Sequence, residues 1–288
     1  MGGPSSEREI SLRSGTAVAR GLKDAGYEVV EIDVKGPDFQ IPPGVEAAFI
    51  VLHGEFGEDG HIQGILEKRG LPYTGSGPAA SRRSFDKVLS KKVFLEHGIP
   101  TPEYEVLEKG RQRSLSLPVV IKPACQGSSI GVHRVMLESE WGKALADSFS
   151  YGSQIVVEAY IKGRELTAGV VESEVLPIVE ITAPDDWYGY DAKYTKGASR
   201  YLVPAPLDSR TETLCREITL RTYTALGCRG MGRVDFRLSE DGQLYVLELN
   251  NIPGFTETSL LPKAAAQAGI GFASLCDRIM RIARTGDE

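Results

Sequence analysis

The spacing of hydrophobic positions in the first third of the chain predicts helices and strands in alternation. Residues 11–25 carry apolar side chains at helical spacing and end before a glycine. Residues 28–34 are rich in β-branched side chains, and residues 47–52 are apolar throughout, as in a parallel strand that is covered on both faces. A short helix is predicted over 59–69. This alternation predicts an N-terminal α/β domain with a parallel sheet.

The pattern changes after a turn-rich segment at residues 71–78, which predicts a domain boundary. A helix is predicted over 84–97, and residues 184–200, rich in Gly, Asp and Tyr, are predicted to form a loop. The other predicted strands are 118–122, 130–135, 155–160, 165–171, 177–181, 232–238 and 244–249, and the other predicted helices are 211–226 and 271–283.

Composition and charge exclude several classes of protein. The 288 residues are 41% hydrophobic and 25% charged, which is typical of a globular protein. A net charge of −6 argues against a nucleic-acid partner. The longest apolar run, residues 47–52, is far shorter than the roughly 20 residues that span a bilayer, so no membrane partner is expected. The 4 cysteines lack C-x-x-C spacing, which predicts reduced thiols in a cytoplasmic protein.

Two short motifs fit known patterns but not their context. Residues 75–80 match the dinucleotide pattern G-x-G-x-x-A, yet Pro72 and Pro78 favour a linker. Residues 127–131 match G-x-S-x-G, the nucleophile elbow of serine hydrolases. A strand rather than a helix is predicted after that elbow, and His133 is the last histidine of the chain. A serine hydrolase of that fold is therefore excluded.

A glycine-serine turn follows the strand that carries Lys122. The backbone N–H groups of such a turn can hold phosphate oxygens, and the lysine supplies a positive charge. The same segment taken alone fits an exposed hairpin turn with a surface lysine equally well.

The strands predicted over 232–238 and 244–249 carry a second polar set, joined by an Asp-Gly turn. Residues two apart on a strand face the same side, so Arg233 can converge with Asp235, and Glu248 with Asn250. Two carboxylates and an amide oxygen suit Mg²⁺, which also binds substrate phosphates. The alternative, a solvated hairpin face, is less favoured because the neighbouring side chains are apolar. Together with the phosphate turn, this set indicates Mg²⁺–nucleotide chemistry.

Taken together, these segments resemble the D-alanine–D-alanine ligases, which are members of the ATP-grasp superfamily. The matches occur in order along nearly the whole chain, and their combination is specific although several are weak alone. They are residues 2–9, 53–60, 72–77, 86–87, 122–123 with 127–129, 158, 163–165, 192–194, 232–235, 248–250, 253–254 and 259–260.

The resemblance implies an α/β protein, α+β overall, with the ATP-grasp fold. The expected domains are an N-terminal parallel-sheet α/β domain over 1–75, a central small domain over 76–161 and a C-terminal domain with the metal site over 162–288. ATP would lie between the last two domains. The resemblance further implies a cytoplasmic homodimer that ligates two D-alanines to D-alanyl-D-alanine for peptidoglycan synthesis. The first carboxylate would attack the γ-phosphate to form an acylphosphate, and the second amine would displace phosphate from it.

Family roles can be carried onto the matching positions. The resemblance implies that Glu7, helped by Ser128 and Tyr194, holds the ammonium of the first D-alanine, and that His53 lies near its carboxylate. Arg233 and the Gly254 N–H would stabilise the oxyanion. Arg233, Ser259 and Leu260 would bind the second carboxylate. Preorganised donors of this kind suit a tetrahedral intermediate.

The resemblance also implies the nucleotide and metal sites. The expected phosphate contacts are Lys87, Lys122 and Lys193; the adenine and ribose contacts are Glu158, Glu165 and the backbone of Ala159 and Ile161; and the ligands of two Mg²⁺ ions, or Mn²⁺, are Asp235, Glu248 and Asn250. Divalent cations and lysines offset the charge on a phosphoryl group in transfer. Residues 184–200 are expected to be a lid that ATP and substrate order.

Other functions stay open. One alternative is a sister ligase that makes D-alanyl-D-lactate or D-alanyl-D-serine, although Tyr194 resembles the dipeptide-forming branch. The other is a nucleotide-binding homologue without activity, against which the intact Lys122 and Arg233 argue. Three departures from the family are Asn251 in place of threonine, Arg82 and Arg83 in place of small residues, and the sequence of the loop 186–191.

The largest departure lies at the start of the chain. The first β-strand of the family, an apolar run ending in Gly-Gly, is absent, and the chain opens at the turn that carries Glu7. We expect the natural protein to carry roughly six to ten more residues. We also expect an unfilled hydrophobic slot between residues 29–30 and 49–50. An apolar strand restored before Met1 should raise the melting temperature and lower the Michaelis constant for the first D-alanine.

Overall fold

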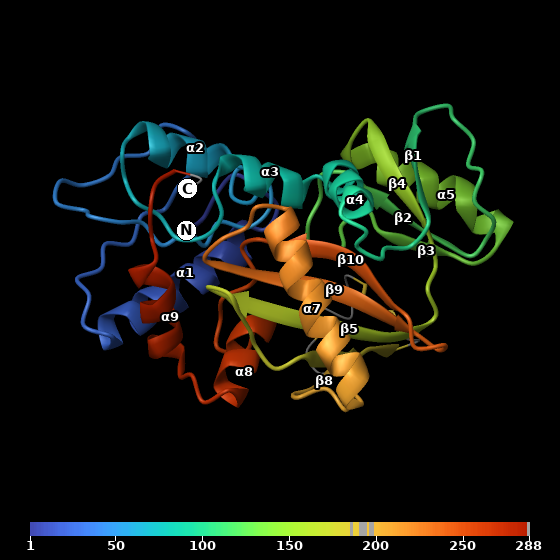
Figure 1. The fold of residues 1–288 in the computed structure, drawn as a ribbon. Coiled ribbons are helices and arrows are strands. Elements are labelled where there is room, and N and C mark those ends of the chain that lie inside the picture. The colour runs from blue at the N-terminus through green and yellow to red at the C-terminus, as the bar shows by residue number, and fades with distance from the viewer. Residues whose placement is uncertain (185–186, 190–194, 196–198, 287–288) are drawn as a thin grey trace.

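The computed structural model describes residues 1–184, 187–189, 195 and 199–286. An N-terminal unit lies at one end of the molecule and a four-stranded sheet at the other, with a six-stranded sheet between and below them in the view of Figure 1. Helices pack on the sheets, and both sheets are antiparallel, so the predicted α+β class is confirmed. Among the described residues, none of the helices is both long and apolar enough to span a bilayer.

The N-terminal unit combines helices from both ends of the chain. Helix α1 packs against the C-terminal helix α9 along the face that contains Gly21, where a Cβ would come within 3.0 Å of Phe272 and Cys276. Tyr73 also exchanges backbone hydrogen bonds with Arg284. The end of the chain therefore completes this unit (Figure 1). Its helices are α1 (Arg8–Asp24), α2 (His61–Lys68), α3 (Pro78–Phe85) and α9 (Phe272–Arg281).

The strands predicted over 28–34 and 47–52 are wrong as regular strands. Both segments are extended chain whose ladder pairing, among the described residues, is limited to isolated parallel bridges such as Ala48 with Tyr73. Extended chain becomes a sheet only when a neighbour accepts and donates hydrogen bonds along its length. The hydrophobic pattern identified the correct segments, but the described residues pair with them only through isolated bridges.

A cavity of about 660 Å³ lies beside both segments. Its walls include Val29, Val30, Phe49 and Ile50, together with apolar side chains of α1 such as Val18. The hydrophobic slot predicted between these segments is therefore present. The cavity is open to solvent, since its lining residue Val30 is 53% exposed, so apolar surface here is left in contact with water.

This cavity predicts that an apolar strand joined before Met1 will stabilise the protein. The Met1 ammonium donates to the Ile32 carbonyl (3.0 Å), Val34 N donates to Met1 O (2.9 Å), and Gly3 N donates to Val34 O (2.6 Å). This is a short parallel ladder, and a residue added before Met1 would continue it along the cavity that Met1 lines.

An engineered extension of about five alternating Val and Ile residues should raise the melting temperature by several degrees, because it buries apolar area and adds ladder hydrogen bonds. Differential scanning calorimetry against an equally long Gly-Ser extension measures the effect. Equal melting temperatures of the two extended proteins would show that the cavity does not accept a strand.

The four-stranded sheet has the order β1-β4-β2-β3, and helix α5 packs on β2 and β3. Strand β2 is buried at every position, Lys122 included. Helix α4 precedes this sheet. The elements are α4 (Lys87–Glu96), β1 (Tyr104–Glu108), β2 (Val119–Pro123), β3 (His133–Val135), α5 (Glu138–Ser148), the 3₁₀ turn η1 (Phe149–Tyr151) and β4 (Gln154–Ala159).

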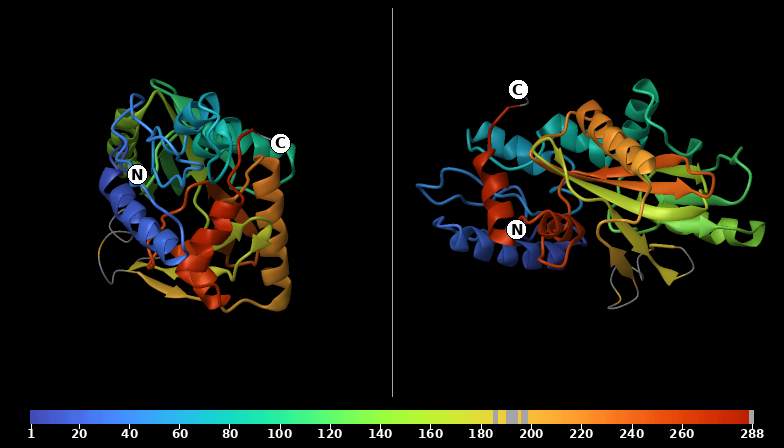
Figure 2. Two further views of the ribbon diagram at one scale, coloured as in Figure 1. Left: turned by 90° about the vertical axis from the view of Figure 1, so that its left-hand side faces the viewer. Right: turned by 60° about the horizontal axis from the view of Figure 1, so that its bottom comes forward.

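The six-stranded sheet has the order β10-β9-β5-β7-β8, with β6 paired to β5. Helix α7 lies across it in contact with β5, β9 and β10, and α8 packs on β5 and α9 (Figure 2). The elements are β5 (Gly163–Val171), β6 (Glu174–Val175), β7 (Val179–Thr182), β8 (Arg200–Leu202), α7 (Ser209–Ala225), β9 (Met231–Ser239), β10 (Leu244–Asn250) and α8 (Leu260–Gln267).

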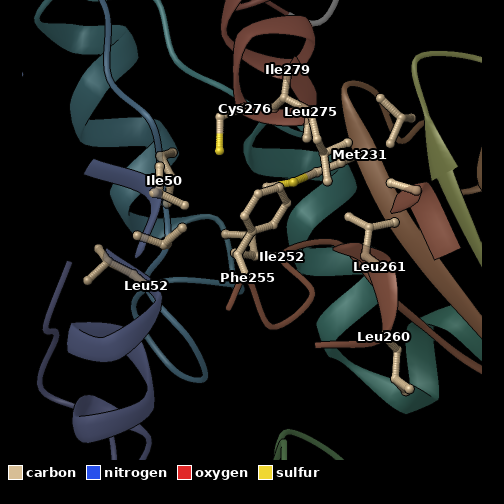
Figure 3. Packing of buried hydrophobic residues seen from close by; sticks show 14 of the residues in the cluster. Ile50, Leu52, Met231, Ile252, Phe255, Leu260, Leu261, Leu275, Cys276 and Ile279 are labelled. Carbon is tan, nitrogen blue, oxygen red and sulfur yellow. The ribbon is translucent and has the colours of Figure 1, made fainter. Parts of the chain in front are cut away.

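One hydrophobic cluster joins the N-terminal unit to the six-stranded sheet. Figure 3 shows Ile50 and Leu52 on one side and Met231 and Leu261 on the other, with Phe255 between them. Phe255 belongs to the segment after β10 and is fully buried. The cluster therefore holds that segment, which carries three of the predicted site residues, in a fixed place between the units.

Candidate active site

A β-bulge in β10 decides which side chains face the site. Val246 pairs with Phe236 and Glu248 pairs with Asp235, so Leu247 is an extra residue on β10. Without it, strict alternation would turn Glu248 to the same buried face as Val246. The bulge instead aligns Glu248 with Asp235 on the open face, which is a common use of bulges near active sites.

The open face of β9 carries a tightly paired Asp235. Its carboxylate accepts two hydrogen bonds from Arg233 (2.8 and 2.7 Å) and one from Thr167 (2.6 Å). Burial opposes the charge on Arg233, but Asp235 more than offsets this and raises the pKa of the guanidinium. The opposite face of β9, with Val234 and Phe236, packs in the core under α7.

The carboxylates of Asp235 and Glu248 occupy opposed positions on neighbouring strands, and Asn250 lies opposite Arg233. Like charges directly opposite each other are destabilising unless a cation sits near them. Lys87 is one such cation, with its Nζ 3.4 Å from Glu248 Oε2. No cluster of three His, Cys, Asp or Glu is found among the described residues. Two carboxylates and one amide oxygen nevertheless fit Mg²⁺, which takes its other ligands from water and phosphate.

The predicted phosphate turn has the backbone of an anion-binding loop. Ser128 and Ser129 have φ angles of 52° and 58°, in the left-handed region that non-glycine residues seldom adopt. A turn of this kind can present successive backbone N–H groups to an anion. Lys87 Nζ donates to Gln126 O (2.7 Å) at the start of the turn. The exposed-hairpin alternative is wrong for Lys122, which is buried.

Lys122 is paired with a buried carboxylate in this structure. Its Nζ donates to Glu158 Oε2 at 2.6 Å, and the other oxygen of Glu158 lies 2.7 Å from Lys91 Nζ. Burial alone would raise the pKa of the Glu158 carboxyl, but the two ammonium groups hold it below its ordinary value. Glu158 is therefore an ionised side chain in the wall of a pocket.

That pocket lies between the two sheets and unites most of the predicted nucleotide residues. It has a volume of about 90 Å³. Glu165, across the pocket on β5, is paired with Arg237 (3.2 Å), whose Nε also donates to Ile161 O (3.1 Å). The predicted site residues in its wall are Lys87, Lys122, Glu158, Ala159, Ile161, Glu165, Asp235 and Glu248.

Glu7, from the N-terminal unit, contacts the predicted phosphate turn at residues 127–129. Ser128 Oγ donates a hydrogen bond to the Glu7 carboxylate, as the resemblance implies. A Cβ on Gly54 or on Gly127 would lie 2.6 Å from Glu7 Oε2, so both glycines are needed to admit the carboxylate. Glu7 is 9% exposed. The turn that would hold phosphate is thus also attached to a buried carboxylate from a different unit.

His53 is buried beside this carboxylate in a fixed tautomer. Its Nδ1 lies 3.1 Å from Ile252 O, which only accepts, so the proton is assigned to Nδ1. Its Nε2 then accepts from Ser14 Oγ (3.1 Å). Burial lowers the pKa of the imidazole, which keeps His53 neutral. Glu58 Oε1 lies 3.5 Å from Nδ1.

No sequence pattern identified Glu58 as a group with a shifted pKa. Burial raises the pKa of its carboxyl to about 8. A carboxyl whose folded pKa is raised contributes stability below its ordinary pKa, and this contribution is lost as pH rises through 8. We therefore expect Glu58→Gln to flatten the loss of stability between pH 5 and pH 8, a difference of roughly 1.4 kcal/mol per pH unit at most.

The check is the melting temperature of both proteins across that pH range. Glu55→Gln is the matched control, because Glu55 is exposed on the same loop. Parallel curves for the wild type and Glu58→Gln would contradict the buried neutral carboxyl.

The segment after β10 carries the remaining predicted residues. A Cβ on Gly254 would lie 3.2 Å from Ser259 Oγ, which also accepts from Thr256 N (3.0 Å). Ser259 precedes the first residue of α8, Leu260. The carboxylates that would attract cations lie on β9 and β10. The group that would attract an anion is separate from them, because it is the N-terminus of α8 at Ser259, which favours a carboxylate.

Two predicted site residues, Lys193 and Tyr194, lie outside the described residues, as does most of the predicted lid. The motifs also missed pocket residues that the structure reveals. Tyr160, Trp187 and Arg237 line the pocket, and Arg134 lies over both rings at 5.5 Å. The spacing of aromatic residues beside the strand ends was the available signal, but it does not reveal which rings face the pocket.

Two family models match the chain. The model described as "D-ala D-ala ligase C-terminus" matches residues 91–281, and "D-ala D-ala ligase N-terminus" matches residues 38–76. Among curated proteins, the D-alanine–D-alanine ligase of Methylacidiphilum infernorum is 47% identical over 98% of this chain and 93% of its own length. That of Syntrophotalea carbinolica is 46% identical over 97% and 93%.

Solved structures agree in fold along nearly the whole chain. The D-alanine–D-alanine ligase from Bacillus anthracis complexed with ATP superposes with a TM-score of 0.84 at 33% identity, covering 98% of this chain and 94% of that one. A second structure of the Bacillus anthracis ligase gives a TM-score of 0.86 at 36% identity, with the same coverage.

Proposed function

This chain belongs to the D-alanine–D-alanine ligase family, and from that premise we propose that it joins two D-alanines to D-alanyl-D-alanine, with ATP converted to ADP and phosphate. It is an ATP-dependent ligase with the ATP-grasp fold. The product would serve peptidoglycan synthesis. The single observation that carries the proposal is the bond from Ser128 to Glu7, which attaches the phosphate turn to a buried carboxylate from the N-terminal unit.

Glu7 is proposed to bind the ammonium of the first D-alanine. Glu7 is 9% exposed, and a substrate ammonium matches both the charge and the hydrogen-bond capacity of its carboxylate. His53, which is buried beside Glu7, is proposed to lie near the carboxylate of that D-alanine, and its neutral imidazole adds no charge beside the ammonium. The substrate carboxylate would then point toward the phosphate turn at residues 127–129. This places the attacking oxygen near the γ-phosphate, which is the positioning that phosphoryl transfer requires.

The nucleotide is proposed to lie in the pocket between the sheets. Glu158 would accept from the adenine, Glu165 would bind the ribose, and the backbone of Ala159 and Ile161 would contact the base edge. Lys87 and Lys122 would reach the phosphates, with Lys193 from the loop. Support comes from the common pocket wall and from two buried lysines beside an anion-binding turn.

Asp235, Glu248 and Asn250 are proposed to hold two Mg²⁺ ions, for which Mn²⁺ is an alternative. Such ions offset the negative charge that builds on the transferring phosphoryl group. The two carboxylates oppose each other across β9 and β10, an arrangement that a divalent cation stabilises. A metal ligand role for Asp235 requires Arg233 to give up at least part of its hydrogen bonding to that carboxylate.

Arg233 and the Gly254 N–H are proposed to stabilise the oxyanion formed when the second amine attacks the acylphosphate. Arg233, Ser259 and Leu260 would also bind the carboxylate of the second D-alanine. A phosphate leaving group makes this attack feasible, because a free carboxylate is a poor electrophile. The N-terminus of α8 offers backbone N–H groups to that second carboxylate.

The test is ADP formation with D-alanine, L-alanine, and D-alanine mixed with D-lactate. The proposal expects ADP and D-alanyl-D-alanine with D-alanine, little turnover with L-alanine, and no depsipeptide with D-lactate. A depsipeptide product would favour the sister ligase, and would contradict the resemblance of Tyr194 to the dipeptide-forming branch. ADP binding without ligation by any substrate would favour an inactive homologue.

The homodimeric state and the cytoplasmic location stay predictions of the family resemblance. Light scattering coupled to gel filtration tests the first. A monomer at micromolar concentration would contradict it.

A further inference from the structure

Each carboxylate oxygen of Glu158 lies beside a lysine ammonium, and only one of the two lysines lines the nucleotide pocket. Lys122 lies in the pocket wall, whereas Lys91, on α4, is fully buried behind it. Lys91 Nζ also donates to Thr101 Oγ1, and Thr101 Oγ1 donates to Val246 O of β10 (2.8 Å). Lys91 therefore contacts Glu158 without lining the pocket.

The surroundings of Lys91 hold its ammonium in place. The rings of Phe94 and Tyr104 each lie 5.8 Å from Nζ. Burial lowers the pKa of this ammonium to about 8, although the Glu158 carboxylate opposes the shift. A buried charge of this kind is costly, and a structure retains it when a partner requires it.

The proposed function requires Lys122 to change partner. Its ammonium is held at 2.6 Å by Glu158 in this structure, yet a bound nucleotide would draw it toward the phosphates. If Lys122 were the sole cation, Glu158 would then be left as a buried carboxylate without a countercharge. Removing one member of a buried charge pair is strongly unfavourable.

We propose that Lys91 is a positioning residue of the nucleotide site, the permanent counter-ion that keeps Glu158 charged and aimed into the pocket when Lys122 turns to the phosphates. This inference rests on the proposed function. Lys91 touches neither substrate nor nucleotide. Because Lys91 stays on Glu158, Lys122 can leave this carboxylate and bind the phosphates.

The test compares Lys91→Met with the wild type in binding MgADP and adenosine, measured by isothermal titration calorimetry. Adenosine has no phosphates, so Lys122 can stay on Glu158 and the affinity should change little. MgADP draws Lys122 away, so its affinity should fall on the order of tenfold to hundredfold in the variant. Lys92→Met is the control, because Lys92 is exposed on the same helix.

A purely structural role would weaken both ligands equally, and that result would overturn the proposal, as would unchanged MgADP affinity. If Lys91→Met does not fold, Lys91→Gln takes its place, because a glutamine amide can still donate hydrogen bonds to Glu158 and Thr101 without carrying a charge. It should show the same selective loss of MgADP affinity, and an equal change in the affinity for both ligands would count against the pairing role.

The outcomes separate this inference from the proposed function. If the wild type binds neither MgADP nor adenosine, the proposed nucleotide site is wrong. If the wild type binds both and Lys91→Met matches it, the inference about Lys91 alone is wrong.

Discussion

Glu248→Gln should lose nearly all turnover, roughly a thousandfold, while the protein stays folded. The loss follows if this carboxylate bridges both proposed cations, because the several kcal/mol that they contribute to phosphoryl transfer would disappear. The fold should be unaffected, since Glu248 is partly exposed and its removal relieves the opposition to Asp235. Steady-state ADP release, with the melting temperature measured alongside, gives the answer.

Glu240→Gln provides the control for that variant. Glu240 lies in the same hairpin, at its exposed turn, and pairs with Lys162 at the surface. Its replacement should leave turnover unchanged. Rates like those of the wild type in Glu248→Gln would remove the assignment of the metal site to β9 and β10.

Arg233→Lys should lower kcat by roughly a hundredfold to a thousandfold, the usual effect of removing one preorganised oxyanion donor. Lysine keeps the positive charge but cannot form the bidentate hydrogen bonds that Arg233 donates to Asp235. The Michaelis constant for the second D-alanine should rise as well, because the same guanidinium is proposed to bind its carboxylate.

Initial rates at varied D-alanine and saturating ATP separate the two effects. Arg278→Lys, which alters a surface pair with Glu172 and Glu174, is the control and should behave as the wild type. An unchanged kcat in Arg233→Lys would show that the oxyanion is stabilised elsewhere.

Strand prediction succeeded where the sheet is complete. Residues 163–171 and 231–239 form β5 and β9 within one or two residues of their predicted bounds, because each has paired neighbours on both sides. It failed over 28–34 and 47–52, where the apolar pattern is correct but the described residues pair with these segments only through isolated bridges. Hydrophobic pattern reports which segments are suited to a sheet, not whether a partner is present.

Some helices and strands were not predicted because their sequences lack a strong hydrophobic periodicity. Strand β1 at Tyr104–Glu108 is half polar, and α5 and α8 were not predicted. The helix predicted over 84–97 is α4, which begins at Lys87; the residues before it end a separate helix, α3, and Asp86 caps α4 by accepting from Val88 N and Leu89 N. An aspartate that caps a second helix is hard to distinguish from one inside a single helix.

Residue types and their order predicted Asp235, Glu248 and Lys122 as parts of one site, and all three line one pocket wall. The roles assigned to them stay predictions. The bulge at Leu247 could not be predicted, and without it alternation would have hidden Glu248. Lys91 and Glu58 were also missed, because burial of a charged side chain depends on segments far away in the sequence and leaves no local signal.

The central claim is that a substrate carboxylate is activated by transfer of the γ-phosphoryl group in the site between the sheets. The direct measurement uses D-alanine carrying ¹⁸O in both carboxylate oxygens, with unlabelled ATP and water, and mass spectrometry of the released phosphate. An acylphosphate formed from the substrate oxygen predicts phosphate with one ¹⁸O atom. Unlabelled phosphate, formed together with dipeptide, would contradict the account.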